Sequence, residues 1–169
     1  KAKINQHDYK IRILGSNISI DRFLFDIDPV SSINELIEIS NLPKNEKVIL
    51  IWPEGILPGL YQDTLIEFDW LFNDKLNKNH LLALGINKKI TENEITKYFN
   101  SLSIYDYQLN LINSYNKINL VPFGEFLPME KVLRGLGLNT ITNSYQSYTS
   151  GNQRKILDIK TNDFSVRIL

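Results

Sequence analysis

Two short runs of apolar residues constrain the fold of this chain more than any other feature. Lys47–Trp52 and His80–Gly85 are nearly continuous in apolar side chains and show no alternation with polar ones. A strand with this pattern is typical of a sheet that is covered on both faces. The chain therefore needs layers on each side of a central sheet, which favours an α/β or α+β sandwich over a helical bundle or a pure β-barrel.

The remaining patterns mix strands and helices. Pro29, with Ser31 and Ser32 after it, predicts an N-capped amphipathic helix that runs to about Ile39, and Asp63 is a candidate cap for a second helix reaching Asn79. The tract 87–94 is polar and predicts a turn. Further strands are predicted at Lys10–Gly15, Lys97–Tyr105, Leu109–Lys117, Arg154–Lys160 and Phe164–Leu169, with a short helical piece at Met129–Leu136. No repeat or linker divides the chain.

Composition excludes several classes of function. The 169 residues are 43% hydrophobic, and 19 Lys and Arg balance 19 Asp and Glu, so no global charge favours a nucleic-acid partner. The chain has no cysteine, which excludes disulfides, thiolate metal sites and a cysteine nucleophile within these residues. No stretch approaches the roughly 18 apolar residues of a membrane-spanning helix. The two histidines, His7 and His80, have no acid at ligand spacing, so no metal site is predicted.

Glu54 is the first candidate for chemistry. It follows the apolar strand ending at Trp52, where the end of a sheet forms a crevice and a desolvated carboxylate is suited to act as a general base. An ordinary strand-to-loop junction with a solvated acid explains the position equally well. Sequence position alone leaves both interpretations open.

Lys117 and Glu125 belong to a second candidate segment, residues 115–128, which is dense in Pro, Gly and aromatic side chains. A lysine held beside glutamates would keep its charge and stabilise an oxyanion during acyl transfer. The alternative is a surface lysine with a solvated head group. Two other features, Asp69 between aromatic residues and the pair Tyr145 and Tyr148, would line a pocket or simply pack in the core.

Taken together, the two segments resemble the nitrilase, or carbon–nitrogen hydrolase, superfamily, and more narrowly its apolipoprotein N-acyltransferase family. The family has a W-P-E tripeptide, here Trp52-Pro53-Glu54, and a motif Y-x-K-x-x-L-V-P-F-G-E-[FY]-x-P, which residues 115–128 match at every fixed position. Tyr98-Phe99-Asn100-Ser101 is similar to the family's Y-x-N-[ST] strand. Asn17-Ile18 is similar to the start of its N-I-P-Q segment, although Ser19-Ile20 replaces Pro-Gln.

The resemblance implies a nitrilase-like α-β-β-α sandwich and a Glu–Lys–Cys triad. Glu54 would be the general base, Lys117 would stabilise the tetrahedral intermediate, and Glu125 would be a supporting acid. The implied reaction passes a phospholipid acyl chain through a cysteine thioester to the N-terminal diacylglyceryl cysteine of an apolipoprotein, with no metal or organic cofactor. The implied location is the bacterial inner membrane, with the catalytic domain on the periplasmic side. Trp52, Phe123, Phe126 and Leu127 would hold acyl chains or pack in the core.

The resemblance also implies that this is part of a larger domain. Residues 1–9 would be a linker from membrane helices that precede the chain, and residues 10–169 would be the first part of the catalytic domain. The family's cysteine would come shortly after Leu169, so the chain by itself is predicted to be inactive. Two alternatives stay open: a fragment of a soluble nitrilase-type amidase or carbamoylase, and an inactive remnant that serves only as a structural or interaction module.

Overall fold

The computed structural model describes residues 9–15, 28–129, 135, 147–161 and 165–168. Its centre is a five-stranded mixed sheet with the order β1-β2-β3-β4-β5, and a separate two-stranded sheet of β6 and β7 packs against one of its faces. The strands are β1 (Tyr9–Ile13), β2 (Lys47–Trp52), β3 (His80–Glu92), β4 (Ile95–Tyr105), β5 (Leu111–Asn116), β6 (Leu157–Lys160) and β7 (Ser165–Ile168). The helices are α1 (Pro29–Ser40), the 3-10 helix η2 (Leu65–Phe68) and α2 (Asp69–Phe72).

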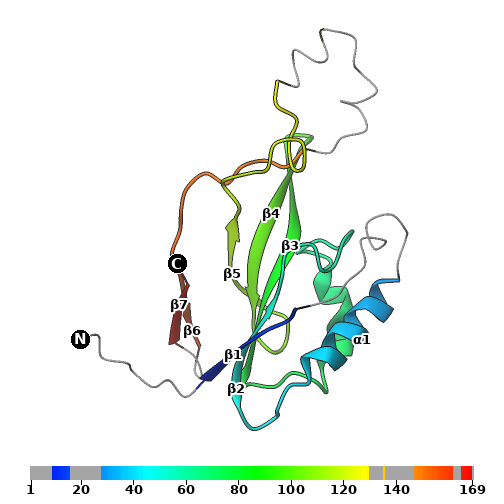
Figure 1. Cartoon of the computed structure of the whole chain (residues 1–169), viewed down its shortest axis with the longest axis vertical. Helices are drawn as coiled ribbons and strands as arrows, with labels where there is room; N and C mark the ends of the chain where they lie inside the picture. The colour runs from blue at the N-terminus through cyan, green and yellow to red at the C-terminus, as the bar shows by residue number, and fades with distance from the viewer. Residues whose placement is uncertain (1–8, 16–27, 130–134, 136–146, 162–164, 169) are drawn as a thin grey trace, which may run out of the picture.

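The large sheet is covered on both faces, as the apolar runs predicted (Figure 1). Strands β1, β2 and β3 are parallel, and β4 and β5 continue the sheet antiparallel. Alternate residues of β2 point to opposite faces. Leu50 and Trp52 pack with Ile33 and Leu36 of α1, whereas Ile49 packs on the other face with the small sheet. The mixed α/β class is confirmed, with a helical layer, a large sheet and a small sheet among the described residues.

Helix α1 begins one turn earlier than its serines suggested. Asp28 is the N-cap, because its carboxylate accepts hydrogen bonds from the amides of Val30 (3.2 Å) and Ser31 (3.1 Å). Pro29 occupies the first helical position, where a missing N–H costs nothing. The prediction of an N-capped helix is confirmed, and its cap is Asp28, which precedes the Pro29–Ser32 segment that indicated it.

The second helix is much shorter than predicted. Its helical part consists of η2 and α2 and ends at Phe72, well before Asn79. Beyond it the side chain of Asn77 accepts a hydrogen bond from the Asn79 amide (2.9 Å), and the His80 ring accepts one from the Asn77 amide (3.3 Å). Local side-chain bonds of this kind compete with helix formation, and Asn favours them.

The polar tract after Gly85 is a strand and not a turn. β3 continues to Glu92 and pairs with β4 as far as Ile95, and the turn itself is Asn93-Glu94, both with positive φ. Positive φ at both central residues is what a tight two-residue hairpin requires. Cross-strand pairing therefore overrides the polar composition, because an exposed hairpin satisfies its backbone in the ladder and leaves polar side chains in water.

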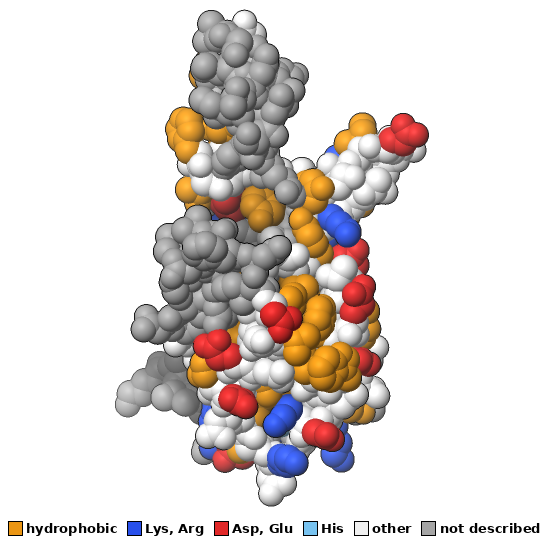
Figure 2. Space-filling model, turned by 90° about the vertical axis from the view of Figure 1, so that its right-hand side faces the viewer, with side chains coloured by type: hydrophobic (Ala, Val, Ile, Leu, Met, Phe, Trp, Pro, Cys, Tyr) orange, Lys and Arg blue, Asp and Glu red, His pale blue; other side chains and the backbone are white. Residues whose placement is uncertain are grey.

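The predicted β5 and the β6–β7 hairpin are confirmed, with strand ends that differ by a few residues. The helical piece predicted at Met129–Leu136 and the expected linker 1–9 lie mostly outside the described residues, and the family-like Asn17-Ile18 lies wholly outside them. Within the described part of the chain, no helix is long and apolar enough to cross a membrane. On the helix-bearing face, acidic and basic side chains are interspersed, as expected for a chain with no net charge (Figure 2).

Candidate active site

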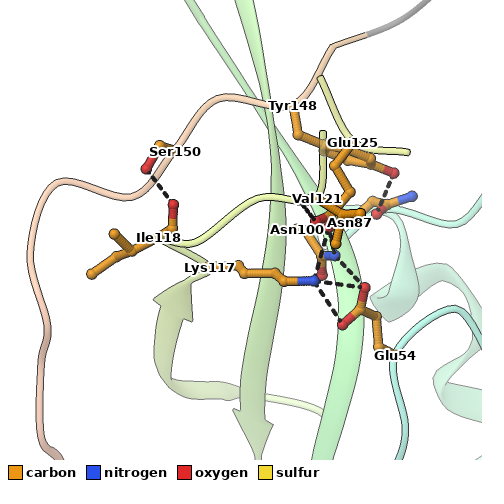
Figure 3. Close-up of polar contacts among 9 residues, drawn as sticks. All are labelled: Glu54, Asn87, Asn100, Lys117, Ile118, Val121, Glu125, Tyr148 and Ser150. Carbon is orange, nitrogen blue, oxygen red and sulfur yellow. Dashed lines mark hydrogen bonds and ion pairs between the residues drawn. The ribbon is translucent and has the colours of Figure 1, made fainter. Parts of the chain in front are cut away.

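The three predicted site residues lie together beside β3 and β4, at the place where β2 and β5 end (Figure 3). Glu54 follows β2, Lys117 follows β5, and Glu125 lies in the loop after Lys117. The Lys117 Nζ is 3.3 Å from Oε1 of Glu54 and 3.1 Å from Oε1 of Glu125. A single ammonium group therefore bridges two carboxylates that are far apart in the sequence.

Glu54 is more exposed than a crevice position suggested. Its side chain is 57% exposed, which agrees with the interpretation of a solvated acid and not with that of a desolvated carboxylate, the two alternatives that the sequence left open. The reason is its place just past the strand: Trp52 is the last β2 residue and is fully buried, and the chain turns at Gly55 with a φ of 73°. Glu54 is therefore held at the solvent-exposed rim of the site.

The backbone of Glu54 is held closely by Gly85 of β3. A Cβ built on Gly85 would lie 2.6 Å from the Glu54 Cα and 2.7 Å from its amide nitrogen. These distances are too short for any side chain, so glycine is required here by close approach of the two strands. The position of Glu54 is thus determined by packing between β2 and β3.

Glu125 is the buried acid of the site, with a side chain 10% exposed. Its Oε2 accepts a hydrogen bond from the Val121 amide (2.7 Å), and its own amide donates to the Val121 carbonyl (2.8 Å). Burial raises the pKa of Glu125, but the bonds from Val121, Asn100 and Lys117 outweigh burial, so the net shift is downward. Glu125 is therefore ionised at neutral pH although it is buried.

Lys117 also keeps its charge, because its contacts with the two acids oppose the effect of burial. Burial lowers its pKa, but hydrogen bonds and charge attraction from Glu125 and Glu54 outweigh burial and raise it. Its amide donates to the Asn100 carbonyl (2.8 Å), which joins the end of β5 to β4. The site thus contains two acids and one cation, and the cation is suited to stabilise a developing oxyanion.

Sequence analysis did not assign three polar residues of the site, Asn100, Asn87 and Tyr148. Asn100 belonged to a family-like strand, and Tyr148 had been considered only as a pocket-lining or packing residue. Asn100 Nδ2 lies 2.6 Å from Oε1 of both Glu54 and Glu125, and the Tyr148 hydroxyl donates to Asn87 Oδ1 (2.9 Å). With Glu54 and Glu125 they line a cleft of about 520 Å³. Tyr145 lies outside the described residues.

The segment 148–151 runs alongside the site and is bound to it by its backbone. The Tyr148 amide donates to the Glu125 carbonyl (2.7 Å), and the Gly151 amide donates to the Lys117 carbonyl (2.9 Å). The Ser150 hydroxyl donates to the Ile118 carbonyl (2.7 Å; Figure 3). This segment therefore holds the two site residues of the 115–128 loop in place.

The apolar residues that were considered for acyl chains separate into two groups. Trp52 is fully buried, packs against Phe72 and donates from its indole nitrogen to the Ser40 hydroxyl (3.0 Å), so it belongs to the core. Leu127 is also buried. Phe123, in contrast, is 71% exposed and has a φ of 63°, so its side chain is displayed on the loop that carries Glu125.

No protein-family model matches the chain. Curated relatives named apolipoprotein N-acyltransferase do match it. The protein of Brucella suis biovar 1 is 31% identical over 114 residues, which is 66% of this chain and 21% of that protein. The Caulobacter vibrioides protein is 33% identical over 109 residues, covering 61% of this chain and 21% of its own. The Rhodopseudomonas palustris protein is 28% identical over 163 residues, which is 89% of this chain and 30% of that protein. The chain therefore spans less than a third of these relatives.

Solved structures give weaker similarity. A nitrilase-superfamily protein of Saccharomyces cerevisiae has a TM-score of 0.46 and 15% identity, over 84% of this chain and 48% of its own. A CN-hydrolase superfamily protein of Xanthomonas campestris has a TM-score of 0.43 and 14% identity, over 83% of this chain and 46% of its own. The family resemblance expected from the motifs is confirmed by the sequence relatives.

Proposed function

Given that this chain is a relative of the apolipoprotein N-acyltransferases, we propose that it supplies the acid–base part of an N-acyltransferase active site. The observation that supports this most is the Lys117 ammonium, which lies 3.3 Å from Glu54 and 3.1 Å from Glu125. Acyl transfer is accelerated by a group that moves a proton and by a hydrogen-bond donor or cation at the developing oxyanion. Glu54 and Lys117 have these two roles in the proposal, and Glu125 is the supporting acid that keeps Lys117 in place.

The proposed reaction has two halves. In the first, Glu54 takes the proton of a cysteine thiol, the sulfur attacks the ester carbonyl of a phospholipid, and the C–O bond breaks. The proton passes from Glu54 to the leaving oxygen, which leaves a thioester and a lysophospholipid. In the second, the α-amino group of an apolipoprotein's diacylglyceryl cysteine attacks the thioester and the C–S bond breaks. Glu54 takes the amine proton and returns it to the sulfur, while Lys117 faces the oxyanion in both halves.

The thiol of this scheme is not among the 169 residues, since the chain has no cysteine. We therefore propose that a cysteine outside the chain completes the triad, and that the 169-residue chain alone transfers no acyl group. The proposed location is the periplasmic side of the bacterial inner membrane, where phospholipid donor and apolipoprotein acceptor are both present. No metal or organic cofactor enters the scheme.

The test is an N-acylation assay on the membrane protein that carries this chain, with a phospholipid donor and a diacylated lipopeptide acceptor. Glu54→Gln and Lys117→Ala are each expected to lower turnover by about 10²-fold or more, the usual size of a lost acid–base or oxyanion group. Matched controls are Glu67→Gln and Lys78→Ala, which change exposed side chains elsewhere and should leave turnover unchanged.

Three outcomes would contradict the proposal. One is near-normal turnover in either site variant, and another is acyl transfer by the 169-residue chain alone. The third is hydrolysis of small amides by the same preparation with no acylation of the lipopeptide, which would indicate a nitrilase-type amidase instead.

A further inference from the structure

Asn100 contacts all three of the predicted site residues. Its side-chain nitrogen, Nδ2, lies 2.6 Å from Oε1 of Glu54 and 2.6 Å from Oε1 of Glu125. Its backbone carbonyl accepts a hydrogen bond from the Lys117 amide at 2.8 Å. Figure 3 shows its side chain between the two carboxylates, beside the Lys117 ammonium. No other described residue is hydrogen-bonded to all three.

The chemistry of an amide suits this position. The NH2 group of asparagine has two hydrogens and no charge, and an ionised carboxylate only accepts hydrogen bonds. With one hydrogen donated to each carboxylate, both donors of the Asn100 side chain are used. The two acids and Lys117 carry a net charge of −1, so the single ammonium does not neutralise both acids. A neutral double donor therefore binds both carboxylates together without adding charge.

Asn100 is also the one member of the group that lies within a strand, since Glu54, Lys117 and Glu125 lie outside the strands. It lies within β4, paired in register with Asn87 of β3, and is 9% exposed. Glu54 and Glu125, in contrast, belong to loops beyond the ends of strands. Groups that a sheet holds are more precisely placed than groups on loops. The sheet therefore fixes Asn100, and Asn100 in turn holds the two carboxylates by its hydrogen bonds.

We infer that Asn100 is the positioning residue of this site, which binds the ionised carboxylates of Glu54 and Glu125 and so sets their places relative to Lys117. Asn100 acts through these acids and takes no part in bond making. The catalytic consequence rests on the proposed function, whereas the binding of the two carboxylates does not.

The first test needs no catalysis. In the 169-residue chain, the side-chain carboxyl carbons of Glu54 and Glu125 are followed by NMR during a pH titration. The groups that face Glu125 are Lys117, Glu54, Tyr148 and Asn100. Asn100→Ala removes one donor and leaves the rest, so the titration midpoint of Glu125 is expected to move to higher pH. Asn100→Asp keeps the shape of the side chain but adds a third acid, so it should move the midpoint further in the same direction.

The matched control is Ser103→Ala. Ser103 lies on the same strand, is fully buried, and accepts a hydrogen bond from Gln62 Nε2 (2.7 Å) away from the carboxylates. It should leave the Glu125 midpoint unchanged. A wild-type Glu125 midpoint in both Asn100 variants would overturn the inference. If the alanine variant does not fold, the midpoint in Asn100→Asp alone decides.

The second test uses the N-acylation assay. Asn100→Ala is expected to lower kcat by about 10-fold to 100-fold, as for a misplaced catalytic group, and to move the acidic limb of the pH–rate profile upward with the Glu125 midpoint. If the midpoint moves but the wild-type protein acylates nothing, the proposed function fails and the carboxylate-binding role stands. If the protein is active and Asn100→Ala keeps the wild-type rate and pH profile, the inference fails and the proposed function stands.

Discussion

Gly85→Ala is the sharpest test of how the fold positions Glu54. Gly85 does not have a left-handed φ, so an alanine there is opposed by lack of space and not by backbone strain. Its Cβ would lie 2.6 Å from the Glu54 Cα, and ordinary contact begins at 3.4 Å. The neighbouring atoms are backbone, which cannot turn aside as the end of a flexible side chain does. Either Glu54 or β3 must therefore move by about 0.8 Å, the difference between these two distances.

The size of the effect follows from this displacement. Overpacking of a core costs about 1–3 kcal/mol. For a chain of this length, each 1 kcal/mol lowers the midpoint of thermal unfolding by about 2–4 °C, so we expect a decrease of roughly 2–12 °C. A misplacement near 1 Å in an active site costs about 10²-fold in rate. The contact between Lys117 Nζ and Glu54, now 3.3 Å, should also lengthen.

The assays are thermal unfolding followed by circular dichroism in the 169-residue chain, and the N-acylation assay that tests the proposed function. Gly15→Ala is the matched control, because a Cβ on Gly15 meets no atom of the described residues within 4 Å and its φ is not left-handed. The control should keep both the unfolding midpoint and the rate. A Gly85→Ala variant with the wild-type midpoint and full activity would refute the argument that β3 holds Glu54 by close approach.

Three further predictions concern other parts of the fold. Asp28→Ala removes the N-cap of α1 and should lower the free energy of unfolding by about 1 kcal/mol in urea titrations. Burial lowers the pKa of His80, so the unfolded chain binds the proton more tightly than the folded chain does. The contribution of His80 to the free energy of unfolding should therefore be complete above the ordinary pKa of 6.5 and should decrease as the pH falls below it. Urea titrations from pH 7.5 to 5 should show a smaller decrease in His80→Gln than in the wild type. Gly151→Ala places a Cβ against the Asn116 carbonyl and should reduce N-acylation, whereas unchanged activity would show that segment 148–151 does not hold Lys117.

The strands were predictable where the pattern was strong. The apolar run in β2 indicated burial on both faces, and the structure shows Leu50 and Ile49 in two separate core clusters. Predictions were wrong where hydrogen bonds, and not the apolar pattern, decide the backbone. The second helix ends at Phe72 and is followed by local bonds of the Asn77 side chain, and the tract after Gly85 is a strand that pairs with β4.

The sequence by itself determined the mixed α/β class, the family resemblance and the choice of Glu54, Lys117 and Glu125 as candidate site residues. These follow from local properties, namely the spacing of apolar side chains and two contiguous motifs. Tertiary structure alone decided that one ammonium bridges both acids, that Glu125 and not Glu54 is buried, and that Asn100 lies between them. The physical reason is that these contacts join residues from different strands and loops, and their distances depend on strand register and close packing, which no local pattern encodes.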